Sequence, residues 1–283
     1  MNKVLPLLLF LCPLSALSQT PEDTIPAPAD TGRQAIECHF PAVIQPRRAT
    51  MIGIGATEFL DTYLSAEKHR GTEVRFLSHS TRTTRWERIS QVLIHQGQAA
   101  TAHNRADNGQ EIGGQYNLQY ALRYNWLRYI GGGTLFVDAG AGADLCLGFL
   151  YNTRNGNNPA QARMSLNIGP SASATYAFNI RKAPMHLRYG IQMPLVGLMF
   201  SPNYGQSYYE IFNKGNYDHN IVPTTIASTP SLRHLLSLDF KAGRSFVRIG
   251  YLGDYQQARV NGLKYHQYTH LLMIGIVRPL PYK

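Results

Sequence analysis

The sequence predicts an all-β protein: a single antiparallel transmembrane β-barrel of about ten strands, with eight and twelve strands as the alternatives. Three observations lead to this prediction. Only 16% of the 283 residues are charged, against roughly 25% in an ordinary soluble domain. No segment after the N-terminus approaches the ~20 continuous apolar residues that a membrane helix needs. The chain is rich in Gly (25) and Tyr (17), and its dominant pattern is the alternation of polar and apolar residues.

The clearest alternation runs from Tyr116 to Trp126, where every second residue is apolar or aromatic. Successive side chains of a strand point to opposite faces, so this segment has one apolar and one polar face. A strand of a soluble sandwich usually covers only about 5–6 residues, whereas ~9–11 tilted residues cross a membrane. The length of the run therefore favours a barrel over a secreted β-sandwich.

Similar alternation predicts nine further strands. They are Thr50–Leu60, Thr72–His79, Glu87–His103, Leu135–Phe149, Met164–Phe178, Met185–Leu195, Leu232–Lys241, Phe246–Gln256 and Lys264–Val277. The connections between the strands alternate between short and long ones, as periplasmic turns and external loops do in an outer-membrane barrel. The predicted turns are Ser80–Arg85, Gly131–Gly133, Arg181–Pro184 and Gly243–Arg244. The predicted external loops are Asp61–Arg70, Asn104–Ile112, Asn152–Gln161, Ser201–Pro230 and the tight Arg259–Gly262.

The N-terminal residues 1–18 are typical of a cleaved secretory signal, with Lys3, the apolar run Val4–Leu11 and the small-x-small pattern Ala16–Ser18. Residues 19–48 form a proline-rich periplasmic lead-in, and residues 49–283 form the barrel. Cys12 raises the alternative of a lipoprotein, but Leu11 before it is bulky where a small residue is expected. These features predict the outer membrane of a Gram-negative cell as the location.

The mature chain has a net charge of +9, because the signal removes one Lys from the total of +10. Its basic residues are scattered, and the signal takes the chain out of the cytoplasm, so nucleic acid is not expected as a partner. Outer-membrane lipid and the phosphates of lipopolysaccharide are the expected partners of the rim Arg and Lys residues. The chain is expected to be a monomer. The two cysteines after the signal, Cys38 and Cys146, are interpreted as unpaired thiols.

Parts of the chain resemble a Bacteroidetes family of unknown function, catalogued as domain of unknown function 3316. The resemblance rests on Gly53–Gly55, Leu60–Ser65 and Arg70–Phe76 near the start of the barrel, and on Tyr265–Tyr268 and Leu271–Gly275 at its end. It implies an outer-membrane barrel with no assigned activity, so it brings no catalytic residue with it. The chain ends in Tyr-Lys rather than on an aromatic residue, which departs from the common outer-membrane pattern.

The polar parity of the strands carries interleaved charges of both signs, which we expect to face the lumen. They are Glu73, Arg75, Arg123, Asp138, Asp144, Arg188, Arg233, Asp239, Lys241, Arg248 and Asp254. A barrel of about ten strands is only slightly wider than an eight-stranded one, which side chains nearly fill. The main hypothesis is therefore a lumen filled by paired charges. The alternative is a narrow passive pore, in which the excess of Arg favours small anionic solutes.

The long predicted loop Ser201–Pro230 is rich in aromatic residues, which suit contact with an external ligand. They are Tyr204, Tyr208, Tyr209, Phe212 and Tyr217. The simpler interpretation is that they pack the loop over the barrel mouth. Asp218 and His219 stand together in the loop, but two ligands without a third do not predict a metal site. No cofactor is expected.

Catalysis is not predicted from the sequence. A lipid-modifying barrel enzyme needs a nucleophile and a base that lie close together at the membrane rim, and no motif indicates such a pair. His234 and His270 fall on the parity expected to face lipid, and a neutral His near the membrane interface is the simplest interpretation. The sequence therefore predicts a non-enzymatic barrel that is structural or contacts a ligand through its external loops, with the pore and the lipid-modifying enzyme as alternatives.

Overall fold

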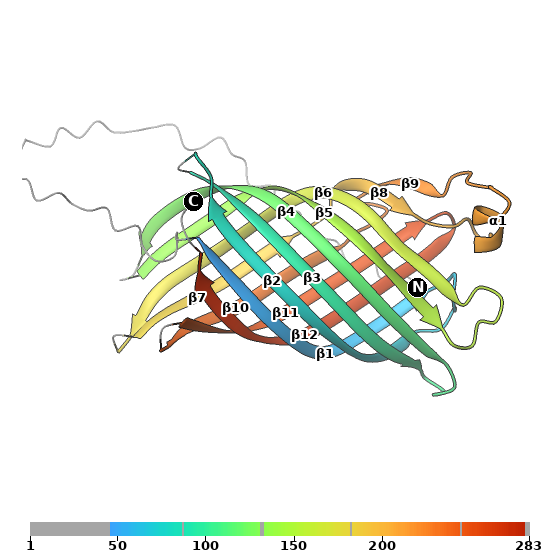
Figure 1. Cartoon of the computed structure of the whole chain (residues 1–283), viewed down its shortest axis with the longest axis horizontal. Helices are drawn as coiled ribbons and strands as arrows, with labels where there is room; N and C mark the ends of the chain where they lie inside the picture. The colour runs from blue at the N-terminus through green and yellow to red at the C-terminus, as the bar shows by residue number, and fades with distance from the viewer. Residues whose placement is uncertain (1–45, 87, 131–132, 182, 244, 281–283) are drawn as a thin grey trace, which may run out of the picture. The chain divides into compact units, whose positions relative to one another are not determined.

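The computed structural model describes residues 46–280 apart from 87, 131–132, 182 and 244. The predicted signal, the lead-in up to residue 45 and Cys38 lie outside the described residues. Within them the chain forms one antiparallel sheet that closes into a barrel of ten wall strands (Figure 1). No helix in this part of the chain is long and apolar enough to cross a membrane.

Twelve strand segments and one short helix build the structure. They are β1 (Arg47–Asp61), β2 (His69–Thr83), β3 (Ile89–Asn104), β4 (Gln110–Ile130), β5 (Gly133–Asn152), β6 (Ala160–Ile180), β7 (Ala183–Gln192), β8 (Val196–Phe200), α1 (Tyr208–Phe212), β9 (Ile221–Thr225), β10 (Leu232–Ala242), β11 (Ser245–Val260) and β12 (Leu263–Pro279). β7 and β8 occupy one position in the wall, since both pair with β6. β9 and β10 occupy the next, since they pair with β8 and β7.

The first and last strands of the barrel pair directly. β1 runs antiparallel to β12 from Arg47 opposite Pro279 to Asp61 opposite Tyr265. β5 also pairs with β6, so the wall has no unpaired edge between these two strands and the sheet closes. Closure matters in a membrane because an unpaired backbone group in hydrocarbon costs several kcal/mol.

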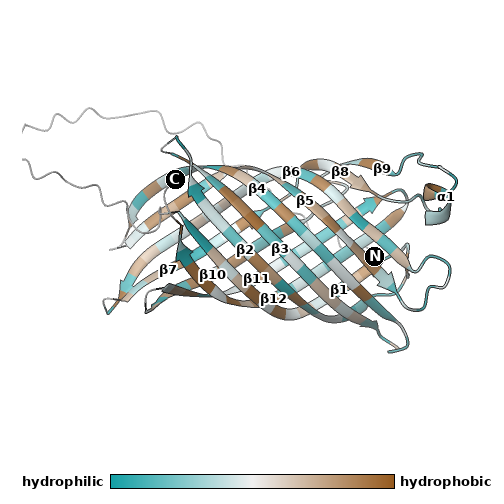
Figure 2. Cartoon of the chain, in the orientation of Figure 1, coloured by the Kyte–Doolittle hydropathy of each residue, from teal (hydrophilic) through white to brown (hydrophobic). Residues whose placement is uncertain are grey.

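Side chains alternate between the two faces of the wall, as the sequence predicts. In β1 and β12 the outward Ile52, Ile54 and Ile274 are exposed, whereas the inward Met51 and Met273 are buried. Figure 2 shows the resulting alternation of apolar and polar bands along the strands. An exposed apolar exterior around an enclosed lumen is the arrangement of a transmembrane barrel. The prediction of a barrel rather than two stacked sheets is thus confirmed.

One predicted strand, Met185–Leu195, is interrupted. β7 ends at Gln192 and β8 begins at Val196, and between them the amides of Met193 and Leu195 donate to carbonyls of β6. The chain inserts one extra residue here relative to β6, because Gln192 pairs with Ser171 but Val196 pairs with Ile168. Such a bulge shifts the side-chain parity by one residue. Outward residues are therefore odd-numbered in β7 and even-numbered in β8.

The two ends of the barrel differ, as the alternating connections predict. One end, called here the turn end, has the connections 84–88, 131–132, 181–182 and 243–244. The other, called the loop end, has 62–68, 105–109, 153–159, 201–220 and the tight 261–262. Figure 1 shows α1 at the loop end. The predicted loop Ser201–Pro230 is partly regular, because it contains both α1 and β9.

Candidate functional site

A chain of buried ion pairs occupies the middle of the lumen. The guanidinium of Arg75 lies 2.6 Å from a carboxylate oxygen of Glu73 and 2.6 Å from one of Asp254. Arg233 continues the chain, at 3.1 Å from Asp254 and 3.4 Å from Asp144. Thr269 and Gln267 donate to the second oxygen of Glu73. The geometry joins five of the predicted lumen charges into one network.

Two separate ion pairs lie nearer the turn end. Arg123 contacts Asp138 at 2.8 Å and also donates to Ser171, while Arg248 binds Asp239 through two nitrogens. Arg188 is buried on the same inner face but forms no ion pair with another described residue. Lys241 differs from the prediction: it lies exposed at the turn end, because its strand runs out of the lumen there.

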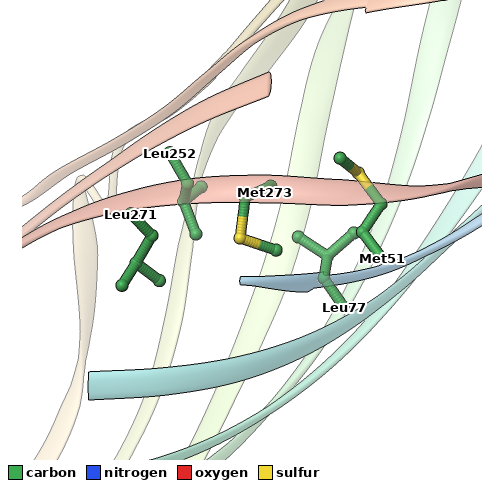
Figure 3. Packing of buried hydrophobic residues seen from close by; sticks show 5 residues of the cluster. All are labelled: Met51, Leu77, Leu252, Leu271 and Met273. Carbon is green, nitrogen blue, oxygen red and sulfur yellow. The ribbon is translucent and has the colours of Figure 1, made fainter. Parts of the chain in front are cut away.

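Apolar side chains also fill the lumen, which the sequence reasoning missed. Met51, Leu77, Leu252, Leu271 and Met273 form a buried cluster called here the apolar layer, and Figure 3 shows them on neighbouring strands inside the barrel. These residues sit on the polar parity of their strands. Their positions could have been predicted, because they have the same parity as the lumen charges. The sequence-based prediction included only the charged residues of that face.

A second apolar cluster closes the lumen toward the loop end. It consists of Phe59, Leu64, Ala100, Ala102 and Leu150, with Tyr63 packed against it. The register of β1 and β2 gives the order of these groups along the lumen. Glu73 and Arg75 lie between the Phe59 row, near the loop end, and the row of Met51 and Leu77 in the apolar layer. From the loop end to the turn end, the lumen therefore holds an apolar cluster, the ion-pair network, the apolar layer and the basic residues near Arg188.

The sequence reasoning missed two polar contacts near the loop end. Arg163 lies 3.2 Å from Asp61 and stacks over the ring of Tyr265. His69 lies 3.4 Å from Glu111. Cys146, the free cysteine among the described residues, is buried in the wall of a cavity of about 80 Å³ beside the ion-pair network.

The predicted loop aromatics separate into one buried anchor and an exposed group. The hydroxyl of Tyr208 accepts from the amide of Ala162 at 2.7 Å and donates to Gln161 at 2.9 Å, so it ties α1 to β6. Burial raises the pKa of Tyr208 to about 12, so its hydroxyl remains a donor at neutral pH. The other predicted aromatics are 58–79% exposed. They are Tyr204, Tyr209, Phe212 and Tyr217.

The helix α1 has a capping box. Ser207 accepts from the amide of Glu210, and the carboxylate of Glu210 accepts from the amide of Ser207. The amide and the hydroxyl of Ser207 both donate to the Glu210 carboxylate. These hydrogen bonds, chiefly the one from the amide, lower the pKa of Glu210. Asp218 and His219 contact each other at 2.8 Å while exposed. No group of three metal-ligating side chains occurs in the described part of the chain.

Removing the Tyr208 hydroxyl tests its anchoring role. The Tyr208→Phe variant leaves the Ala162 amide without its acceptor, and we expect the free energy of opening residues 201–220 to fall by about 1–3 kcal/mol. Amide hydrogen exchange of this segment measures the change. The Tyr209→Phe variant is the matched control and should exchange like the wild type, because Tyr209 is exposed. Equal protection in the Tyr208→Phe variant would contradict the anchor.

The outward histidines sit among tyrosines. His234 stacks near Tyr255 at 5.9 Å between ring centroids, and His270 bonds to the hydroxyl of Tyr251. Gly253 lies under the His234 ring, where a Cβ atom would come within 2.3 Å of its Nε2. The His234 ring therefore lies against the outer wall, and both histidines belong to an aromatic patch with Tyr251 and Tyr255.

The turn end carries a basic collar. Its described residues are Arg48, Arg82, Arg85, Arg88, Arg128, Arg181, Lys241 and Arg278. In the described part of the chain no exposed Asp or Glu accompanies them. Arg88 donates to the hydroxyl of Tyr124, and Arg85 lies over the ring of the exposed Trp86. Basic and aromatic side chains together are typical of a membrane interface.

Comparison with known protein families decides the identity of the chain. A family model described as "Protein of unknown function (DUF3316)" matches residues 7–282. The chain belongs to the DUF3316 family. No curated protein matches the DUF3316 chain.

Solved barrels resemble the DUF3316 barrel in shape. The transport unit of the autotransporter AIDA-I from Escherichia coli is 5% identical, with a TM-score of 0.46 over 84% of this chain and 90% of that one. The COG4313 outer membrane channel from Pseudomonas putida F1 is 7% identical, with a TM-score of 0.34 over 84% and 96%. The translocator domain of autotransporter NalP from Neisseria meningitidis is 10% identical, with a TM-score of 0.33 over 83% and 88%. Likenesses this distant carry no information on activity.

Proposed function

We propose that this DUF3316 protein is a non-catalytic and non-conducting barrel of the outer membrane, which contacts a ligand through the surface of its loop end. The observation that carries the proposal is the occupied lumen. Two apolar clusters and the ion-pair network fill successive levels of it. A path for hydrated solutes needs an open polar channel, as in wide porins.

The exterior supports a place in a membrane and an orientation there. Outward side chains are apolar along the middle of the strands, and the basic collar surrounds the turn end. Long loops face the outside in known outer-membrane barrels, and short turns face the periplasm. In this orientation the collar lies at the phospholipid headgroups of the periplasmic leaflet.

The loop end supports the contact role. Tyr208 holds α1 in place, while Tyr204, Tyr209 and Tyr217 remain exposed beside it. An ordered surface with exposed tyrosines loses little conformational entropy on binding. Lys68 and Arg70 on the same end are exposed and share the single carboxylate of Glu58, so this group has a net positive charge that suits lipopolysaccharide phosphates.

Conductance in a planar bilayer tests the proposal. We expect no steady single-channel steps from the folded protein, under conditions in which a general porin conducts. A second variant replaces residues 202–219 by a short Gly-Ser linker, which removes the loop and leaves the lumen side chains. We expect it to be silent as well, because the lumen itself is closed.

Steady steps from the wild type would contradict the proposal and support the narrow pore. Steps from the loop variant alone would show that the loop, and not the lumen, closes the barrel.

A further inference from the structure

Arg188 is a buried cation that forms no ion pair with another described residue. It projects into the lumen from β7 and is 4% exposed. Its Nη2 atom has no hydrogen-bond partner, and no ion pair to it occurs among the described residues. A buried guanidinium in this state is unfavourable, and native proteins normally satisfy such groups.

The residues paired with Arg188 on both neighbouring strands carry hydroxyl groups that also lack hydrogen-bond partners. The register places Thr175 of β6 and Ser237 of β10 directly opposite Arg188. The Oγ1 atom of Thr175 and the Oγ atom of Ser237 are buried without hydrogen-bond partners. Neither hydroxyl accepts a hydrogen bond from Arg188, so the paired strands leave its guanidinium unsatisfied.

The acids that could neutralise Arg188 are already engaged. Asp138, the acid that interacts most with Arg188, accepts from Arg123 through one oxygen and from Ser173 through the other. Asp239 binds Arg248 through both oxygens. The charge of Arg188 therefore has no counterion among the described residues of this part of the lumen.

Arginines outnumber acids around this position. Arg188, Arg123, Arg248 and Arg47 all act electrostatically on His79, which lines the same cavity. Among the described residues, the acids that lie with these four arginines are Asp138 and Asp239. The local field in this half of the lumen is accordingly positive.

A cavity adjoins the unpaired guanidinium. It has a volume of about 50 Å³, and its wall includes Arg188, Arg123, His79, Gln119 and Gly190. The Nε atom of Arg123 is also buried without a partner. The volume is several times the ~10–15 Å³ that holds one water molecule. Leucines of the apolar layer form part of the wall, and their low polarity strengthens charge interactions in the cavity.

We propose that this cavity binds one small tetrahedral oxyanion of the phosphate or sulfate class, held between the guanidinium groups of Arg188 and Arg123. Guanidinium groups bind such anions through paired N–H donors. The anion supplies a counterion for Arg188 and acceptors for the Nη2 atom of Arg188 and the Nε atom of Arg123, which no described residue provides. Leucines of the apolar layer border the site, so binding does not require a conducting lumen.

Binding of inorganic phosphate to the purified full-length barrel in detergent tests the site. Equilibrium dialysis with labelled phosphate should show one bound ion per chain. The thermal midpoint should rise with phosphate and not with chloride at the same pH and ionic strength. Sulfate competes if the site recognises the tetrahedral oxyanion. No bound phosphate, or an equal response to chloride, would overturn the proposal.

The Arg188→Met variant distinguishes a site from a structural residue. We expect its phosphate affinity to fall at least about 100-fold, because charge-assisted hydrogen bonds are lost. In anion-free buffer it should melt at a higher temperature than the wild type, since the unpaired buried charge is gone. The exposed Arg128→Met variant is the control and should bind like the wild type. Wild-type affinity in Arg188→Met would refute the assignment.

The Gly190→Val variant keeps Arg188 and Arg123, and it decides the matter if Arg188→Met does not fold. Gly190 lies in the cavity wall, and the nearest non-adjacent atom to a Cβ built there is 3.9 Å away, so the wall accepts a side chain that occupies the cavity. We expect its phosphate affinity to fall at least about tenfold, because the added side chain takes up the volume that the anion needs. An unchanged affinity would contradict the proposed site.

Discussion

Replacing Arg75 by methionine is expected to lower the free energy of unfolding by about 3–5 kcal/mol. Arg75 is 0% exposed and lies 2.6 Å from both Glu73 and Asp254. Its loss leaves Glu73 buried without a cation beside it among the described residues, and leaves Asp254 with Arg233 alone. This state is far less favourable than the absence of the whole group of charges. Urea unfolding of the folded barrel in lipid vesicles measures the change.

Two variants control for the charge and for the network. Arg70→Met removes an exposed arginine from the outer face, and it should change the stability by at most about 1 kcal/mol. The triple variant Glu73→Gln, Arg75→Met, Asp254→Asn removes the charges together and should recover most of the loss. A single Arg75→Met variant as stable as the wild type would show that the network does not hold the lumen.

Replacing Leu271 by alanine is expected to lower the free energy of unfolding by about 2–5 kcal/mol. Leu271 is 0% exposed in the apolar layer, so truncation leaves a cavity among Met51, Leu77 and Leu252. Unfolding in vesicles measures this loss as well.

The adjacent residue provides the matched control. Leu272 is 71% exposed on the outer face of the same strand. Its side chain contacts lipid in the folded protein, and Leu272→Ala creates no internal cavity, so the loss should be clearly smaller than for Leu271→Ala. The reverse order would mean that the inner and outer faces have been exchanged.

The sequence was sufficient to predict the wall of the barrel, because strand periodicity depends on local order along the chain. Tyr116–Trp126 lies within β4, and the alternation of turns and loops matches the two ends. The bulge after Gln192 was missed, because one inserted residue changes the parity without an obvious break in composition. β9 was missed because its five residues lie within a polar loop.

The sequence predicts which side chains face the lumen, but it does not predict which of them contact one another. Parity placed Arg75 and Asp254 inside, but they are separated by 179 residues, and only the stagger of the closed barrel brings them together. The same stagger leaves Arg188 without an ion-pair partner among the described residues. It also collects Met51 and Leu271 into one layer, although they belong to the first and the last strand of the chain.

The pairing of β1 with β12 has a consequence for biogenesis. Thr57 and Thr269, which bond across this junction, are 212 residues apart. The final row of backbone hydrogen bonds therefore cannot form until translation has finished, and long-range pairing of this kind is slow. Every shorter product has two open edges that attract other chains. The unfinished chain must therefore be kept apart from its neighbours until its last strand is available.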